Sequence, residues 1–319
     1  MITPSQVHWK FVPSHWCFWV EFFLAEFIRQ PQTPRLSGLD SFAGQKQLAR
    51  SFLEAGMAMA TFEMLDDAVL ENCLSLHGQQ NFLQKLVQVS LEKDGLCWMG
   101  PPCGWWTWIS SSKHKRTKAR PEGRTGHPTV AFHNTIAQFV ADAIMTCIAL
   151  GVHFVLEQPL TSVLPDFEAV RTALTEAQAK SIVIPLWKFG ASSHKPLILW
   201  GTAPWLTQLS NVAEKISATQ ASSSQLANDQ SRPGQIHVPG PTCTLAIVGE
   251  NGQVTGIRAD MAASSSYPAC FCDVVAFLHN AHLKSLASKR AAMEVVSILG
   301  RRHPELRKQW FVEGLLVFL

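Results

Sequence analysis

No uninterrupted apolar run in this sequence reaches the roughly 20 residues that a membrane-spanning helix requires, so we expect no transmembrane segment and no membrane partner. The aromatic-rich stretch from Val7 to Ile28 comes nearest, but charged residues and histidines interrupt it. Its bulky apolar residues recur every three or four positions. This spacing predicts an amphipathic helix that packs on the body of the protein.

Cysteine pairs of the Cys-x-x-Cys type are also absent, which argues against a thiol-redox enzyme. The eight cysteines are scattered through 319 residues, and a chain of this length needs no covalent staples. We therefore expect free thiols in an intracellular protein, nuclear if the organism is a eukaryote. We also expect no metal, because one tempting group matches no common zinc spacing. That group is Cys270, Cys272, His279 and His282.

Charge is sparse as well, since charged residues make up 16% of the chain and the formal net charge is +3. This mild positive excess is compatible with a nucleic-acid partner without indicating one. Hydrophobic residues make up 47%, which is enough to bury one large core. Composition divides the chain into an aromatic-rich helix and linker (1–35), an α/β domain (36–205), a small variable region (206–262) and C-terminal helices (263–319).

Three short apolar runs, each typical of a buried strand, are followed by an acid or a thiol. Because the carboxyl ends of parallel strands meet at one edge of a sheet, we expect these groups to share a cleft. Each group alone also has a structural explanation, as a buried small hydrophobe or a surface acid. The runs with their groups are Met57–Phe62 with Glu63, Leu96–Met99 with Cys103, and Val152–Leu156 with Glu157.

The first of these runs belongs to a longer pattern of strand, glycine turn, helix, strand and acid. Leu39–Gly44 supplies the first strand and turn, and the helix is predicted over Gln45–Ala55. The layout predicts a nucleotide-type cofactor site, in which Gly44 lets the backbone approach the ligand and Glu63 accepts hydrogen bonds from ribose hydroxyls. An ordinary βαβ unit without a ligand is the alternative.

A polar segment, residues 105–126, follows the thiol and is predicted to be a mobile loop. Of the tryptophans at its start, Trp105, Trp106 and Trp108, we expect at least two to anchor the loop rather than stack on a base. Its cations would attract a phosphate backbone beside the thiol, although most such runs are solvated surface. These cations are Lys113, Lys115, Arg116, Lys118 and Arg120.

The rest of the pattern predicts an α/β fold with a doubly wound, mostly parallel sheet that ends in an antiparallel hairpin. The short connection between strands 181–189 and 196–200 demands that they pair antiparallel. A second hairpin is expected within 242–257, with Glu250-Asn251-Gly252 as its turn. Further helices are predicted over 66–74, 82–91, 129–150, 167–180 and 269–287.

Three motifs in this order resemble those of the DNA cytosine-5 methyltransferases, which are class I S-adenosylmethionine-dependent enzymes. They are Asp40-Ser41-Phe42-Ala43-Gly44, Gly100-Pro101-Pro102-Cys103 and Leu156-Glu157-Gln158-Pro159, and the similarity spans residues 36–279. The resemblance implies a class I methyltransferase-like sheet and methyl transfer to carbon 5 of cytosine, with Cys103 as nucleophile and Glu157 contacting the base. Implied cofactor contacts come from Asp40, Phe42, Ala43, Gly44, Glu63, Met64 and Pro101, and Lys195 joins the five loop cations in binding nucleic acid.

The sequence departs from the family's pattern in four places. The segment between the predicted antiparallel hairpin and Tyr267 is short for a target-recognition domain. Gln45-Lys46-Gln47 stands where the family has further glycines, Gln158 replaces an asparagine, and Lys195 is the nearest cation to a missing Gln-x-Arg-x-Arg. These departures leave open a weakened or inactive methyltransferase-like nucleic-acid-binding protein, or a class I methyltransferase with another acceptor. We expect S-adenosylmethionine as cofactor, DNA rather than RNA as partner, and a monomer.

Overall fold

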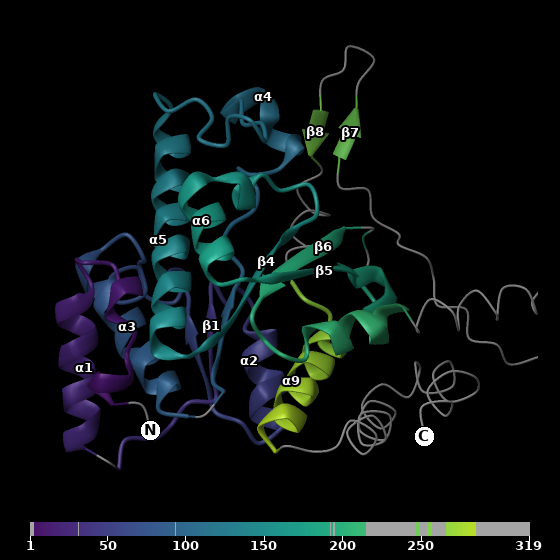
Figure 1. Cartoon of the computed structure of the whole chain (residues 1–319). Helices are drawn as coiled ribbons and strands as arrows, with labels where there is room; N and C mark the ends of the chain where they lie inside the picture. Colours follow the sequence, from purple (N-terminus) through teal and green to yellow (C-terminus); the bar gives the residue numbers. More distant parts are fainter. Residues whose placement is uncertain are drawn as a thin grey trace, which may run out of the picture.

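The computed structural model describes residues 3–30, 32–92, 94–191, 193, 195–214, 246–248, 254–256 and 266–284. In this part of the chain a sheet lies between two groups of helices, so the fold has three layers (Figure 1). The expected α/β class is therefore confirmed. None of the helices in these ranges combines the length and the hydropathy of a membrane span.

The main sheet has the strand order β2-β1-β3-β4-β6-β5. β1 to β4 run parallel, and β6 pairs antiparallel with β5, as predicted, and also with β4. The carboxyl ends of the four parallel strands therefore share one edge. The strands are β1 (Gly38–Ser41), β2 (Met59–Phe62), β3 (Leu96–Met99), β4 (His153–Pro159), β5 (Lys180–Pro185) and β6 (Pro196–Gly201).

Alternating side chains of the strands build a separate core on each face of the sheet. Cys97 and Met99 of β3 pack on one side, while Leu96 and Trp98 pack on the other, as the period of two requires. The first face is covered by α1 (Cys17–Arg29), α3 (Leu76–Ser90), α5 (Pro128–Leu150) and α6 (Glu168–Glu176). The second is covered by α2 (Gln47–Glu54), α9 (Ala269–Leu283) and a helical segment at 206–214.

Shorter elements connect these layers. β7 (Ala246–Val248) and β8 (Val254–Gly256) pair antiparallel, which confirms the second hairpin, while its predicted turn lies outside the described residues. The predicted helix end at 285–287 lies outside them too. The other short elements are η1 (Pro4–Gln6), η2 (Trp9–Phe11), η3 (Trp108–Ser110), α4 (Ser111–His114), η4 (Leu164–Asp166) and η5 (Leu186–Phe189).

The helix predicted over residues 66–74 is wrong, because this stretch forms successive turns. The Asp67 side chain accepts hydrogen bonds from the backbone N–H groups of Val69 and Leu70, and Asn72 accepts one from Leu74. Such side-chain bonds give the backbone an alternative to the helix. The chain becomes helical only at α3, where Ser75 Oγ accepts a hydrogen bond from Gly78 N at 3.0 Å.

Two strand boundaries also differ from the prediction. β5 ends at Pro185 and the chain turns into η5, so 186–189 is not strand. β4 continues through Glu157 to Pro159, because β6 pairs with it there and extends the ladder. Glu157 is therefore a buried residue within the strand and not a surface acid beyond its end.

Candidate active site

The thiol of Cys103 lies beside an ammonium group at the carboxyl edge of the sheet. Lys195 Nζ is 3.8 Å from Cys103 Sγ. Cys103 follows β3, whereas Lys195 directly precedes β6, the antiparallel strand. Glu157 on β4 interacts electrostatically with both groups, so the thiol, the cation and the acid lie together. This is the convergence that the strand-end pattern predicts for Cys103 and Glu157.

Tyr267, which lies two residues before α9, holds the carboxylate of Glu157 in place. Tyr267 Oη donates a hydrogen bond to Glu157 Oε2 at 2.8 Å, and Trp98 Nε1 donates to Tyr267 Oη at 3.2 Å. A Cβ added to Gly100 would lie 2.8 Å from the Tyr267 oxygen, so glycine is required for this close approach. Glu157 is 8% exposed and fixed in orientation.

Burial dominates the protonation of both reactive groups. It raises the pKa of the Cys103 thiol, while the Lys195 ammonium lowers that pKa and the Glu157 carboxylate raises it further. Burial also raises the pKa of Glu157, against the opposing effects of Lys195 and the Tyr267 hydrogen bond. Cys103 therefore rests as a thiol, and Lys195 is the group that favours its ionised form.

Two substitutions should move the pKa of Cys103 in opposite directions. Lys195→Met removes the stabilising cation and raises this pKa, whereas Glu157→Gln removes the opposing carboxylate and lowers it. The pH dependence of iodoacetamide alkylation, followed by mass spectrometry of the Cys103 peptide, measures both shifts. The half-exposed Cys17 on α1 is the internal control, and an identical Cys103 profile in the two variants would contradict this electrostatic arrangement.

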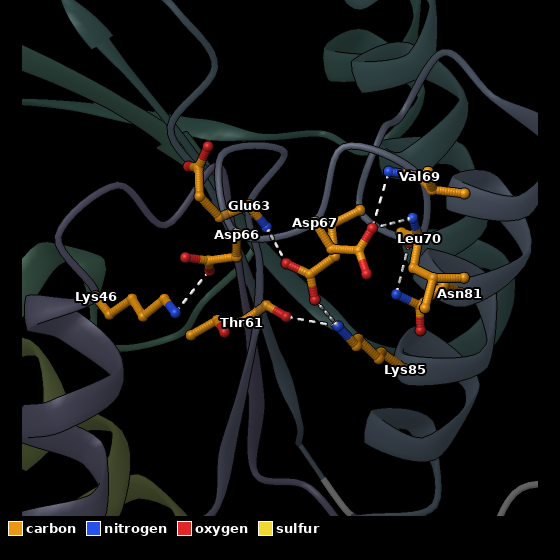
Figure 2. Close-up of polar contacts among 10 residues, drawn as sticks. Lys46, Thr61, Glu63, Asp66, Asp67, Val69, Leu70, Asn81 and Lys85 are labelled. Carbon is orange, nitrogen blue, oxygen red and sulfur yellow. Dashed lines mark hydrogen bonds and ion pairs between the residues drawn. The ribbon is translucent and has the colours of Figure 1, made fainter.

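Glu63 follows β2 and its carboxylate faces the glycine turn after β1. Glu63 Oε2 accepts a hydrogen bond from Gly44 N at 2.9 Å and Oε1 accepts one from Leu65 N at 3.1 Å. Figure 2 shows its carboxylate turned away from Lys85, which pairs with Glu71 at 2.6 Å. The Glu63 backbone N–H also donates a hydrogen bond to the Glu71 carboxylate, which fixes the main chain that carries the Glu63 side chain.

The glycine turn itself is shaped for close approach. Phe42 and Gly44 both have positive φ, at 60° and 50°, and both are at least partly accessible. Lys46, two residues after Gly44, pairs with Asp66 at 2.6 Å (Figure 2). Ala43 is half-buried and Met64 is exposed, so they lie at the accessible rim of the turn and the adjoining loop.

Asp40 lies deeper than a direct ligand contact would require. Its side chain is 2% exposed and accepts a hydrogen bond from the backbone N–H of Ala49 near the start of α2. Burial raises its pKa to about 7, and the neighbouring Glu63 carboxylate adds to the rise. Asp40 therefore positions α2 over the turn rather than offering an open face to a ligand.

Gln158 connects the Leu156-Glu157-Gln158-Pro159 motif to the Gly100-Pro101-Pro102-Cys103 motif. Gln158 Nε2 donates to the Pro101 carbonyl at 2.8 Å, and Ser162 Oγ donates to Gln158 Oε1 at 2.8 Å. Pro101 is buried and acts here through its carbonyl. Gln158 thus links β4 to the turn that carries Cys103.

The basic segment is anchored to the body of the protein through Arg116 and contains η3 and α4, so it is not loop throughout as predicted. The Arg116 guanidinium stacks 3.7 Å from the centre of the Trp106 ring and donates to Asn134 Oδ1 at 2.7 Å, to the Val130 carbonyl and to the Pro121 carbonyl. Arg116 is 4% exposed, and burial lowers its pKa to about 10. We therefore correct its predicted phosphate contact to a structural role.

The other cations and tryptophans of this segment also fall into side chains that pack on the protein and side chains that are exposed. Trp106 is buried and Trp105 lies against His127 and His133, so both anchor the segment as expected, while Trp108 is exposed. The side chains that remain available to a phosphate backbone are Lys113, Lys115, Lys118 and Arg120.

Arg116→Met should lower the free energy of unfolding by about 2 kcal/mol, because it removes charge-assisted hydrogen bonds to groups that stay buried. Denaturant unfolding of the full chain measures this loss. Lys118→Met is the matched control, with an expected change within about 0.5 kcal/mol. Equal effects of the two substitutions would show that Arg116 is not a buried anchor.

Sequence reasoning missed Tyr267 as a partner of Glu157. Tyr267 is the one tyrosine of the chain, and it lies 110 residues from Glu157 in the sequence. Its position before a predicted helix gives no sign of the hydrogen bond between the two side chains.

No protein-family model matches the chain, and no curated protein sequence matches it. What the site does is therefore argued from its residues and geometry.

Proposed function

We propose that this protein transfers a methyl group from S-adenosylmethionine to carbon 5 of cytosine in DNA, through a covalent bond between Cys103 and carbon 6. The observation that supports this most is Cys103 Sγ at 3.8 Å from Lys195 Nζ with Glu157 beside both. A mostly parallel sheet with one inserted antiparallel strand also agrees with the class I methyltransferase architecture that the motifs resemble.

Cys103 acts as the nucleophile in this proposal. Carbon 5 of cytosine is a poor nucleophile until a thiolate adds to carbon 6 and converts the ring to an enamine. The resting thiol must first lose its proton to solvent, and the Lys195 ammonium stabilises the resulting thiolate at 3.8 Å. Desolvation on substrate binding would strengthen that attraction, because the two charges then interact in a less polar medium. Once carbon 5 carries the methyl group, its proton passes to water and the bond between Sγ and carbon 6 breaks, which restores the thiolate and the aromatic ring.

Glu157 binds the edge of the base and helps it accept the thiolate. A carboxyl whose pKa is raised by burial is able to donate a proton to the ring nitrogen while its other oxygen accepts from the exocyclic amine. Tyr267 holds one of the two oxygens at 2.8 Å and so sets the plane of the carboxyl. Negative charge that develops on the ring is thereby neutralised where it forms.

The cofactor side of the site is the turn between β1 and α2 together with the end of β2. Each oxygen of the half-exposed Glu63 carboxylate accepts one backbone hydrogen bond and has capacity to accept another from a ribose hydroxyl, while the adjacent turn offers backbone with positive φ. S-adenosylmethionine bound there would supply an electrophilic methyl group. Phe42 and Met64 offer apolar surface beside the same turn.

Access to carbon 6 requires the cytosine to leave the helix stack, because the atom is covered in a duplex. The exposed cations of the segment after Cys103 are placed to bind the phosphate backbone during this step. β8 lies next to η3 of this segment (Figure 1), so the small hairpin flanks the same side of the molecule.

Two assays on the full chain test the proposal. Calorimetry with S-adenosylhomocysteine should show binding, and tritiated methyl groups should be incorporated into cytosine-containing DNA duplexes but not into duplexes with 5-methylcytosine at every cytosine. Cofactor binding without incorporation would contradict the enzyme and favour a methyltransferase-like nucleic-acid-binding protein. Incorporation into RNA or protein instead of DNA would contradict the proposed acceptor.

A further inference from the structure

A second cluster of ligand-type side chains lies at the opposite edge of the sheet. Asp94 precedes β3, His153 begins β4, and His282 lies in the last turn of α9. One ligand atom from each of these three residues lies within 4.8 Å of the others. The cluster is formed by the amino ends of β3 and β4, whereas Cys103 and Glu157 belong to the carboxyl ends, so the two sites are separate.

Each histidine of the cluster faces a different oxygen of the Asp94 carboxylate, at a distance nearer to that between two ligand atoms of one metal ion than to a hydrogen bond. His153 Nε2 lies 3.6 Å from Asp94 Oδ1, and His282 Nε2 lies 3.6 Å from Asp94 Oδ2. Both distances exceed an ordinary hydrogen bond. Two ligand atoms bound to a tetrahedral zinc ion, each at about 2.1 Å from the metal, lie about 3.4 Å apart.

One nitrogen of the cluster has no other partner. His282 Nε2 is buried from solvent and makes no hydrogen bond to any described residue. A buried imidazole nitrogen without a partner is costly, and a ligated ion would satisfy it. His279, one turn earlier on α9, differs in this respect, because its two nitrogens face Trp205 Nε1 and the Ser37 carbonyl at 3.3 Å each.

The backbone holds these side chains in place without an ion. His153 N donates to the Gly95 carbonyl at 2.9 Å, which ties the loop of Asp94 to the start of β4. A Cβ added to Gly95 would lie 2.5 Å from Val89 Cγ1, so the loop packs directly on α3. Each of the three side chains remains about a quarter exposed, so the cluster lies near the surface of the protein.

From this geometry we infer that Asp94, His153 and His282 form a binding site for a divalent transition metal of the zinc class. Two imidazoles and one carboxylate are a common protein ligand set for zinc, with water in the fourth position. A bound ion would join three segments that are far apart in sequence, namely the loop before β3, the start of β4 and the end of α9. Its role is to fasten α9 to the sheet, and therefore to steady Tyr267 at the other end of the same helix.

Metal titration of the EDTA-treated full chain tests this inference. Zn²⁺ should bind with an affinity that His282→Gln and Asp94→Asn each weaken at least about tenfold. Asparagine tolerates the positive φ of position 94, at 59°, and glutamine suits a helix, so both variants should keep the apo fold. Co²⁺ should give a visible absorption spectrum typical of tetrahedral coordination in the unsubstituted protein and lose it in both variants.

The matched control is His15→Gln, because His15 also pairs with an acid, Asp142 at 3.5 Å, but has no second histidine in that pair. Its zinc affinity should equal that of the unsubstituted chain. Zinc should also raise the melting temperature of the control and not of the two variants. Unchanged zinc affinity in His282→Gln and Asp94→Asn, or no binding at submillimolar zinc, would overturn the inference. These measurements need neither S-adenosylmethionine nor DNA, so they can fail or succeed independently of the proposed function.

Discussion

Replacing Cys103 by serine should abolish methyl transfer, with a loss of at least about 10³-fold, and leave S-adenosylhomocysteine affinity unchanged. The hydroxyl occupies the place of the thiol, but it ionises far less readily, and the Lys195 ammonium at 3.8 Å cannot make up that difference. The cofactor side, formed by the β1–α2 turn and Glu63, does not contact Cys103 through any hydrogen bond of the described residues. Cys103→Ser should therefore lose methyl transfer and keep its affinity for S-adenosylhomocysteine.

Tritium incorporation and calorimetry on the same preparations measure the two quantities. Cys17→Ser is the control, because Cys17 is also partly accessible but lies on α1, where its sulfur bonds only to nearby backbone carbonyls. It should retain full transfer. A Cys103→Ser variant that still methylates DNA would remove the nucleophile from the proposal, and one that loses cofactor affinity would show that the two halves of the site are not independent.

The second large effect concerns the stability of the folded chain. Asp40→Asn should raise the free energy of unfolding at pH 8 by up to about 4 kcal/mol, at about 1.4 kcal/mol per unit of pKa shift. The pKa of Asp40 is about 7 in the folded protein against 3.8 as its ordinary value. The folded state therefore binds more protons than the unfolded state between these values, and stability falls as the pH rises through this range. Asparagine keeps an oxygen for the Ala49 N–H without the buried charge.

Urea unfolding of both proteins between pH 4 and pH 8 tests this prediction. The two should have similar stabilities near pH 4 and diverge as the pH approaches 7. Asp67→Asn provides a control of opposite sign, because backbone hydrogen bonds lower the pKa of that exposed carboxyl and its charge favours the folded state. Asp67→Asn should not raise the free energy of unfolding at pH 8. A constant difference between Asp40→Asn and the unsubstituted chain at every pH would contradict the raised pKa.

The sheet and its reactive edge were predictable because their signals are local. Leu96–Met99 is a short run of apolar side chains bounded by Gly95 and Gly100, and it forms β3 as predicted. The helix predicted over residues 129–150 is α5, which begins at Pro128 and ends where Gly151 adopts a positive φ. Since strand direction follows from connection length, the antiparallel hairpin was predictable as well.

The errors arose where side-chain bonds or distant contacts decide the structure. Asp67 and Asn72 look compatible with a helix, but their side chains bond to nearby backbone instead. Arg116 carries the same charge as its neighbours, and only the fold brings Trp106 beneath it. The cluster of Asp94, His153 and His282 has no compact spacing in sequence, because three different elements bring it together.

The most direct test of the central claim is intact mass spectrometry of the full chain after incubation with S-adenosylmethionine and DNA containing 5-fluorocytosine. Fluorine at carbon 5 blocks the elimination that would release the enzyme, so an attacking thiolate stays attached to carbon 6. We predict a mass increase equal to one DNA strand plus one methyl group, located at Cys103 by peptide mapping and absent from Cys103→Ser. Unmodified protein under conditions in which S-adenosylhomocysteine binds, or an adduct at another residue, would contradict the account.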